Sequence, residues 1–347
     1  MKKRIKKMTM SVLALLMLCG CAPSHEASEM TLSGSQGSVT VKDGNKKISH
    51  FVGMHLYDGY GIRTEKKSYS WIELDKNKLL KMDEMSSSSI SQKEKHLKIN
   101  VESGSLLFCV SKELSEEESL EFETFNMSLS IRGTTGIVKA VAEKRTDIIL
   151  LEGQAQVKTE NDSILLHAGQ RASVIKDEAG NSRIEISEIA LWGDVPSSFV
   201  KEMKENETVS KKIEENDGFM NVIDEEEAVA VMRKFTGSWY GLPILFGDQN
   251  ETCVKIPYSW NIGLTDDGSN VRIDFEAAEG HMDEIEAQGG PQGKSILREN
   301  RFFIRDVRIL NEHTYEVVKR YRASLSEDGD TITFTLPDET ITWTRKN

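Results

Sequence analysis

Candidate catalytic and metal-binding side chains are scattered through the 347-residue sequence. Its seven histidines never occur as His-x-x-x-His or His-Glu-x-x-His, the spacings that place two imidazoles on one helix face for zinc. The phosphate-cradling Gly-x-x-x-x-Gly-Lys-Ser/Thr loop and the Gly-x-Ser-x-Gly turn of a serine nucleophile are also missing. Because acids are abundant, no carboxylate pair stands out as a general acid and base. We therefore expect neither enzymatic activity nor a bound metal or cofactor.

The charge balance limits the partners of the chain. Its 44 basic and 56 acidic residues give a net charge of −12. Nucleic-acid binding draws its affinity from phosphate neutralisation by Lys and Arg, so an acidic chain argues against nucleic acid as a partner. Apart from Cys19 and Cys21 near the N-terminus, the cysteines are Cys109 and Cys253, in separate predicted domains. We expect both to be reduced and buried.

The first 20 residues have the pattern of a secretory signal peptide. Five basic residues and no acid accompany an apolar stretch from Met8 to Leu18, shorter than the roughly 20 residues of a membrane span. The stretch ends in Leu18-Cys19-Gly20-Cys21, where a small residue precedes a cysteine and Leu lies three positions before it. This segment resembles the lipobox of bacterial lipoproteins, in which the cysteine is diacylated and becomes the mature N-terminus.

The lipobox resemblance implies that Cys21 is lipidated, that residues 1–20 are removed and that residues 21–33 form a polar tether. Two acyl chains such as palmitate anchor stably, since each buried CH₂ contributes about 0.8 kcal/mol and one chain is marginal. The expected location is the extracytoplasmic face of the cell membrane. An ordinary signal peptide with two incidental cysteines is the alternative.

Residues 34–176 consist of short alternating hydrophobic segments separated by turns. Leu97, Ile99 and Val101 alternate up to a predicted turn at Ser103-Gly104, and Lys42-Asp43-Gly44-Asn45 is a strong hairpin signal. This pattern predicts an all-β domain, a roll or sandwich of short strands.

The same residues resemble the FecR-like domain over nearly its full length. The family's opening glycine–leucine–glycine–threonine pattern appears between Gly53 and Thr64. The most specific match is Ile131-Arg132-Gly133-Thr134-Thr135-Gly136-Ile137-Val138, which contains the family's Arg-Gly-Thr signature. The resemblance implies an extracytoplasmic binding or sensing domain. FecR proteins that relay a signal to a sigma factor use a cytoplasmic helical segment and a membrane span. We find neither here and do not expect the signalling role to carry over.

Arg132, Gly133 and Thr134 allow two interpretations. In one, Arg132 belongs to a partner-binding surface. In the other, which we favour, a half-buried Arg132 joins loops through carboxylates or carbonyls, because an unpaired guanidinium is costly to bury. Gly133 would then permit close packing, and Thr134 would favour strand geometry. This second interpretation predicts that replacing Arg132 lowers stability.

A helical connector is predicted at residues 177–235, where Asp224 is a plausible N-cap with Glu227 three residues later. Residues 236–347 then alternate again as six or more antiparallel strands opened by Gly-x-Trp, similar to small lipocalin-like barrels. Trp239 could close the floor of such a barrel or contact an apolar ligand.

The sequence thus predicts a mainly β protein with two functional hypotheses. In the favoured one, a non-enzymatic, membrane-anchored envelope lipoprotein uses its FecR-like domain to bind or sense a protein or a cell-wall polymer. In the alternative, the C-terminal antiparallel barrel-like domain carries or senses a small apolar molecule at its mouth.

Overall fold

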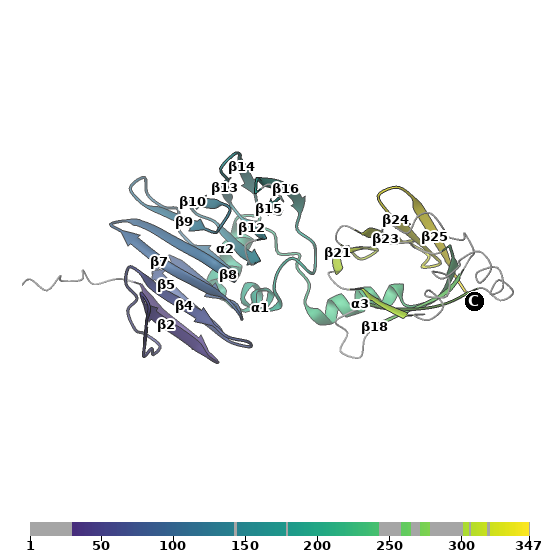
Figure 1. The fold of residues 1–347 in the computed structure, drawn as a ribbon, viewed down its shortest axis with the longest axis horizontal. Helices are drawn as coiled ribbons and strands as arrows, with labels where there is room; N and C mark the ends of the chain where they lie inside the picture. The colour runs from purple at the N-terminus through teal and green to yellow at the C-terminus, as the bar shows by residue number, and fades with distance from the viewer. Residues whose placement is uncertain are drawn as a thin grey trace, which may run out of the picture.

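The computed structural model describes residues 30–141, 144–177, 180–242, 258–264, 271–277, 301–304, 307–317 and 320–346. Within these ranges the protein is mainly β, with two sheets and three short helices, which confirms the fold class expected from the sequence. One β unit lies at each end of an elongated molecule (Figure 1). The predicted signal peptide, Cys21 and Cys253 lie outside the described residues.

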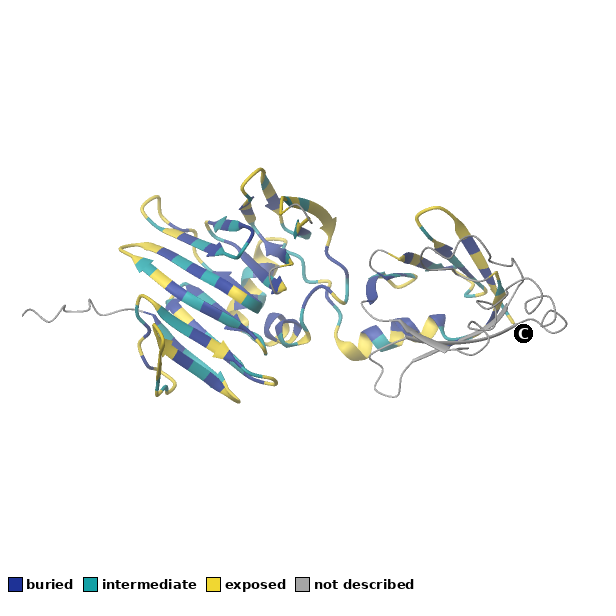
Figure 2. Cartoon of the chain, in the orientation of Figure 1, coloured by how far each residue is buried: buried dark blue, intermediate teal, exposed yellow. Residues whose placement is uncertain are grey.

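The N-terminal unit is a sixteen-stranded sheet in which the described pairs are antiparallel, except for the parallel pair of β8 and β9. Its strands are β1 (Thr31–Gln36), β2 (Val39–Asp43), β3 (Lys46–Ile48), β4 (Tyr60–Thr64), β5 (Tyr69–Asp75), β6 (Lys78–Met82), β7 (Ser87–Lys93), β8 (His96–Val110), β9 (Ser119–Glu123), β10 (Ser128–Ile131), β11 (Thr135–Val141), β12 (Arg145–Glu152), β13 (Gln154–Lys158), β14 (Ser163–His167), β15 (Gln170–Lys176) and β16 (Ser182–Glu188). Buried and more exposed residues alternate along many of them (Figure 2), as expected for strands with one face on a core.

β8 joins two parts of this sheet. Its first half pairs with β7 and β9, and its second half pairs with β6 and β11. Between the halves, Gly104 has a φ of 84°, and a Cβ there would lie 2.5 Å from Ser86 Cα. The turn predicted at Ser103-Gly104 is therefore wrong. The glycine bends one continuous strand, whose partners hold it on both sides of the bend.

The central strands are covered on both faces. Leu106 and Phe108 belong to the main core of the unit, whereas Leu107 and Cys109 belong to a second cluster formed with helices. The helices are α1 (Ser197–Glu205) and α2 (Glu207–Glu215), whose buried apolar side chains are Phe199, Val200, Met203, Val209 and Ile213. Burial of both faces explains the unbroken apolar run at the end of β8.

The N-terminal unit extends beyond both boundaries predicted for it, into the tether on one side and into the connector on the other. Residues 31–33 of the predicted tether are part of β1. Within the predicted connector, β16 continues the N-terminal sheet past residue 176 by pairing with β15. The apolar side chains of α1 and α2 pack on the same sheet, so both helices also belong to the N-terminal unit. Of the three described helices, α3 (Glu225–Phe235) packs on the C-terminal sheet, and its capping box of Asp224 and Glu227 forms as expected.

The C-terminal unit is an antiparallel sheet with the order β20-β19-β18-β17-β25-β24-β23-β22-β21. Its strands are β17 (Gly237–Gly241), β18 (Tyr258–Leu264), β19 (Val271–Ala277), β20 (Arg301–Ile304), β21 (Val307–Asn311), β22 (Thr314–Val317), β23 (Tyr321–Leu325), β24 (Thr331–Thr335) and β25 (Thr340–Arg345). In the described part of the chain, β20 and β21 do not pair, so the sheet is barrel-like in strand order without closing. Its core is aromatic and is covered by α3.

Candidate binding site

The Arg-Gly-Thr signature forms the turn between β10 and β11. Three hydrogen bonds hold this turn in place, two between backbone groups and one from a side-chain hydroxyl. The Leu114 N–H donates to the Arg132 carbonyl at 2.6 Å, and the Val110 N–H donates to the Thr134 carbonyl at 3.1 Å. The buried Thr134 hydroxyl donates to the Gln154 carbonyl at 3.1 Å. The turn is therefore held against the end of β8, the following loop and the start of β13.

Small residues let the backbone segments around this turn come close together. A Cβ on Gly133 would lie 3.0 Å from Glu113 Cα, and one on Gly136 would lie 2.8 Å from the Ile149 carbonyl oxygen. Gly153 has a φ of 81°, a conformation that residues with a side chain adopt only under strain. Gly133 is closely packed, as the favoured interpretation expects, whereas Thr134 lies between β10 and β11 rather than within a strand.

Arg132 does not have the structural role that we favoured. Its side chain is exposed and forms no hydrogen bond or ion pair with any described residue. The interpretation as a half-buried strut is wrong, because Arg132 lies on the turn after β10 rather than within the apolar strand that follows. Its guanidinium instead lines a surface groove of about 760 Å³.

This groove, which we call the signature groove, is built from three parts of the N-terminal unit. Its floor consists of outward-facing side chains of β9, β10 and β13, which lie side by side in the sheet. One wall is the acidic loop 111–118, and another is α2 through Lys212 and Asn216. Leu165 of β14 adds an apolar side chain that is 52% exposed.

Glu152 is the most unusual group of the signature groove. It ends β12, is 3% exposed, and its carboxylate forms an ion pair with Lys212 Nζ at 3.4 Å. Its Oε2 atom has no hydrogen-bond partner. Burial raises the pKa of Glu152, and the Lys212 ammonium opposes that rise. A buried acid with an open oxygen is costly unless a further donor meets it.

Glu152 was not identified as a site residue from the sequence. One signal for its burial was present, because it directly follows the apolar run Ile148–Leu151 in a strand covered on both faces. Its pairing with Lys212 joins residues that are far apart in the sequence, which no local pattern reveals.

The other carboxylates near the groove differ in the number of hydrogen bonds and ion pairs that they form. Hydrogen bonds from the Ser115 N–H and hydroxyl lower the pKa of Glu118 to about 2. Glu113 and Glu116 are exposed and have no hydrogen bond or ion pair with described residues. The described residues contain no group of three or more His, Cys, Asp or Glu side chains that could hold a metal ion.

A second cavity, of about 500 Å³, lies between β5, β6 and α1. Here the buried Lys81 donates to Glu202 Oε2 and to the Ser198 carbonyl, both at 2.9 Å, and Trp71 Nε1 donates to Glu202 Oε2 at 3.1 Å. Burial favours the neutral acid, but hydrogen bonds from Lys81, Asn206 and Trp71 outweigh it and lower the pKa of Glu202. Because these charges already satisfy one another, we interpret this cluster as the attachment of α1 to the sheet.

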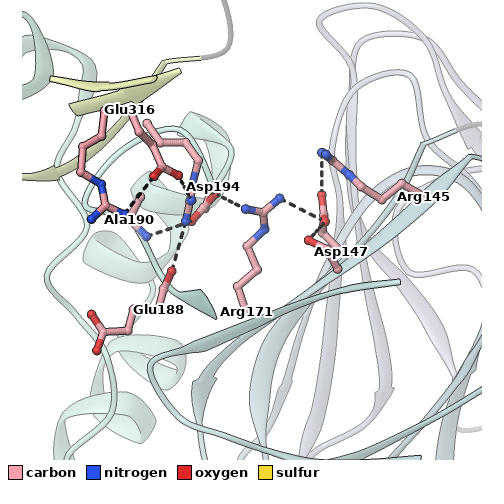
Figure 3. Close-up of polar contacts among 10 residues, drawn as sticks. Arg145, Asp147, Arg171, Glu188, Ala190, Asp194 and Glu316 are labelled. Atoms are coloured by element: carbon pink, nitrogen blue, oxygen red, sulfur yellow. Dashed lines mark hydrogen bonds and ion pairs between the residues drawn. The ribbon is translucent and has the colours of Figure 1, made fainter. Parts of the chain in front are cut away.

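A chain of buried ion pairs, which we call the junction, connects the two β units (Figure 3). Its alternating charges are Arg145, Asp147, Arg171, Asp194, Arg308 and Glu316. Arg171 bridges Asp147 at 3.1 Å and Asp194 at 3.2 Å. Arg308, from β21, contacts Asp194 at 2.7 Å and also pairs with Glu316.

Backbone contacts complete the junction. Arg308 donates to the Glu188 carbonyl at 3.1 Å, and the Ala190 N–H donates to Asp194 Oδ2 at 2.8 Å. Trp192 forms a β-bridge with Ile309. The segment after β16 is therefore hydrogen-bonded to the C-terminal sheet, so the two units meet in a specific contact.

Two further sequence predictions concern single residues. Trp239 is fully buried, its indole N–H donates to the Phe235 carbonyl at 3.1 Å, and the Arg345 guanidinium lies 4.2 Å from its ring centre. These contacts favour the packing role of Trp239 over ligand contact. Cys109 is a free, buried cysteine as expected, and burial raises the pKa of its thiol.

Of the comparisons with known proteins, the family match includes the signature residues. Residues 60–156 match the family model described as FecR protein, which makes this segment a FecR domain. Two crystal structures of a protein from Parabacteroides distasonis, provisionally described as an anti-sigma factor, align at 13% identity with a TM-score of 0.33. The alignment covers 37% of this chain and 59% of that chain. No curated protein gives a match.

The family match covers only part of the chain. It includes the signature turn and Glu152 but ends before α1, α2 and the C-terminal sheet. In the part of the chain that the structure describes, no helix is long and apolar enough to cross a membrane.

Proposed function

We propose that the protein is a non-enzymatic, lipid-anchored envelope protein whose FecR domain binds or senses a protein or a cell-wall polymer. One observation carries the proposal: the residues that identify the FecR domain form the border of the signature groove, where Gly133 and Thr134 are fixed and Arg132 is free. A rigid turn at the border of a groove is suited to recognition, because little conformational freedom of the backbone is lost on binding.

Among the described residues of the groove, no histidine links a hydroxyl nucleophile to a carboxylate, which supports binding rather than chemistry. The polar side chains described in the groove are mainly carboxylates, amides and hydroxyls from separate strands, without a histidine bonded to a nucleophile and a carboxylate. His96 instead shares a hydrogen bond of 2.8 Å with the exposed Ser119 hydroxyl. Such a groove offers contacts for a partner.

The anchoring part of the proposal depends on Cys21 and is tested by Cys21→Ser. Removing the thiol removes the acylation nucleophile, so we expect uncleaved precursor or protein shed to the medium. A mature-size Cys21→Ser protein that still requires detergent for extraction would contradict lipidation at this residue.

The binding part is tested by chemical crosslinking of the lipidated full-length protein in its native membrane. We expect a discrete crosslinked product with an envelope protein or with wall polymer, and the same product at reduced yield from a variant with a disrupted groove. Recovery of only uncrosslinked protein under conditions that crosslink a known envelope complex would contradict the binding function.

The described residues offer no comparable support for an apolar ligand in the C-terminal unit. The side chains of Trp239, Tyr315, Phe334 and Trp343 are buried against one another and against α3. Tryptophan fluorescence against a panel of fatty acids remains the direct test of that alternative.

A further inference from the structure

We propose that the signature groove binds a cationic segment of a partner protein, with the ammonium or guanidinium of a Lys or Arg side chain at Glu152. This inference rests on the proposed binding function and specifies the chemistry of the partner. Its starting point is the open Oε2 atom of Glu152, a buried carboxylate oxygen at the edge of a solvent-accessible groove.

The hydrogen bonding of the Glu152 carboxylate is incomplete. Lys212 lies 3.4 Å from Oε1, an ion-pair distance longer than an ordinary charge-assisted hydrogen bond of about 2.7–2.9 Å. A carboxylate can accept several hydrogen bonds, and bidentate acceptance from an arginine is favourable. Because Oε2 has less than 1 Å² of accessible surface, an incoming cation would reach it only after a small shift of the side chains that cover it.

The charges around the groove favour a cation over an anion. Its carboxylates outnumber its basic groups and are Glu113, Glu116, Glu118, Glu121 and Glu152. The basic groups are Arg132, Lys212 and His96, and Lys212 is already paired with Glu152. Glu113 and Glu116 have no partner among described residues, so they provide unneutralised negative charge at the groove wall.

The remaining lining favours an organic cation on an aliphatic stem over a bare metal ion. The described carboxylates are not gathered into a group of three that could hold a metal. Leu165, 52% exposed, offers an apolar surface for the methylene groups of a Lys or Arg side chain. The groove volume of about 760 Å³ can admit such a side chain with its neighbouring residues.

Gln154 and Gln156 extend the argument from one side chain to an extended segment. Both are exposed on β13 and line the groove, and their amides can donate to and accept from the backbone of a bound strand. The groove thus offers a cationic peptide segment carboxylates for its charge, an apolar side chain for its methylene groups and amides for its backbone.

The test uses the full mature protein in detergent and a fluorescein-labelled peptide, Gly-Lys-Ser-Lys-Gly-Lys-Gly, followed by fluorescence anisotropy. The matched probe is the same peptide with Nε-acetyl-lysine, which keeps the stem and removes the charge. We expect saturable binding of the first peptide, and at least about tenfold weaker binding of the acetylated one, because the buried carboxylate would lose its charge-assisted donor.

Variants then locate the binding. Glu152→Gln should weaken binding of the lysine peptide by about tenfold, because it removes the buried charge and keeps the shape. Glu117→Gln is the control, since Glu117 is on the same acidic loop but pairs with Lys95 at 2.6 Å and does not line the groove. It should change the affinity less than about twofold, because exposed ion pairs contribute little.

A second variant guards against misfolding of Glu152→Gln. The double change Glu113→Gln and Glu116→Gln affects only exposed side chains and should weaken binding by about threefold without changing the melting temperature. Equal binding of both peptides, or equal losses for Glu117→Gln and Glu152→Gln, would overturn the inference. Direct binding of soluble wall fragments without binding of the lysine peptide would overturn it in favour of a wall polymer. In either case a crosslinked product from native membranes would leave the proposed function intact, whereas its absence would contradict that function.

Discussion

The signature groove and the junction both contain buried acidic side chains, but the carboxylates of the two regions differ in how many hydrogen-bond and ion-pair partners they have. At the junction, Asp194 accepts from Arg171, Arg308 and the Ala190 N–H. In the groove, Glu152 has one ion pair and one open oxygen. A charge surrounded by partners holds two units together, whereas the buried Glu152 carboxylate at the edge of the groove is the charge that we propose a partner contacts.

The difference also shows how the two regions relate to the family match. Glu152 and the signature turn lie within residues 60–156, while Arg171, Asp194 and Arg308 lie outside that segment. Most of the groove thus belongs to the matched segment, with Leu165, Lys212 and Asn216 added from outside it, whereas the junction connects Arg145 and Asp147 of that segment to residues that follow it. Replacements in the two regions should therefore have different consequences.

The largest effect is expected for Asp194→Ala at the junction. Removing this carboxylate leaves two buried guanidinium groups without it, and breaking a buried pair by removing one partner costs about 3–5 kcal/mol. Urea unfolding should show the loss, and limited proteolysis should cut faster between β16 and α1. Asp162→Ala, at an exposed turn position, is a control that should unfold like the wild type. An unchanged urea midpoint for Asp194→Ala would show that the ion pairs do not join the units.

Gly136→Val should have the next largest effect. Its new side chain would collide with the Ile149 carbonyl oxygen and the Phe108 ring, both 2.8 Å from an ideal Cβ. Overpacking of this kind costs about 1–3 kcal/mol. The comparison is Gly44→Ala, where a Cβ meets nothing within 4 Å and the only strain is the φ of 55°. If Gly136→Val melts at the wild-type temperature, the close packing around the signature is not needed for the fold.

Glu152→Gln should change the pH dependence of stability rather than abolish folding. Burial raises the folded-state pKa of Glu152, so the ionised carboxylate destabilises the fold at pH values above that pKa. The cost disappears as the pH falls through the folded pKa towards the ordinary value of 4.5. Glu152→Gln lacks this cost, so its advantage over the wild type in urea unfolding should be greatest near neutral pH and shrink towards pH 4.5.

Glu118→Gln should change the pH dependence of stability in the opposite direction to Glu152→Gln. Because hydrogen bonds lower the pKa of Glu118 to about 2, its carboxylate stabilises the fold above pH 4.5, and this contribution is lost as the pH falls towards 2. Glu118→Gln should therefore be less stable than the wild type at neutral pH and converge with it in acid. Identical pH profiles for the two variants would contradict the difference that the structure shows between these acids.

The smallest effect on stability is expected for Arg132→Ala. The side chain is exposed and has no described partner, so the free energy of unfolding should change by no more than about 0.5 kcal/mol. Removing a positive charge from the groove should nevertheless tighten binding of the lysine peptide by about twofold, a small gain typical of an exposed charge. A large loss of stability would restore the interpretation of Arg132 as a structural strut.

Much of the fold could be predicted from the sequence, because its signals are local. Alternating strands, the hairpin at Gly44 and the capping box at Asp224 each depend on residues close in the chain. The bend at Gly104 could not be distinguished from a turn, since only the neighbouring strands of β8 show that the chain continues. The assignment of α1 and α2 to the N-terminal unit likewise depends on which sheet face was left uncovered.

The candidate site could be predicted only in part. The Arg-Gly-Thr residues were identified by their resemblance to a family, but no local pattern indicates whether Arg132 is exposed. Glu152 meets Lys212 across 60 positions, and Arg171 meets Asp194 only when the segment after β16 folds back. Such pairings depend on tertiary structure, and an acidic chain with many similar residues offers no way to select them beforehand.

Site-specific photo-crosslinking in native membranes tests the central claim most directly. Benzoylphenylalanine would replace Gln154 on the groove floor or, as the control, Glu185 on the exposed strand β16. We predict that the Gln154 position yields a crosslinked protein that the lysine peptide displaces and that Glu152→Gln reduces, while the Glu185 position yields none. A product that forms equally at both positions, or one that the lysine peptide does not displace, would contradict the assignment of the signature groove as the binding surface.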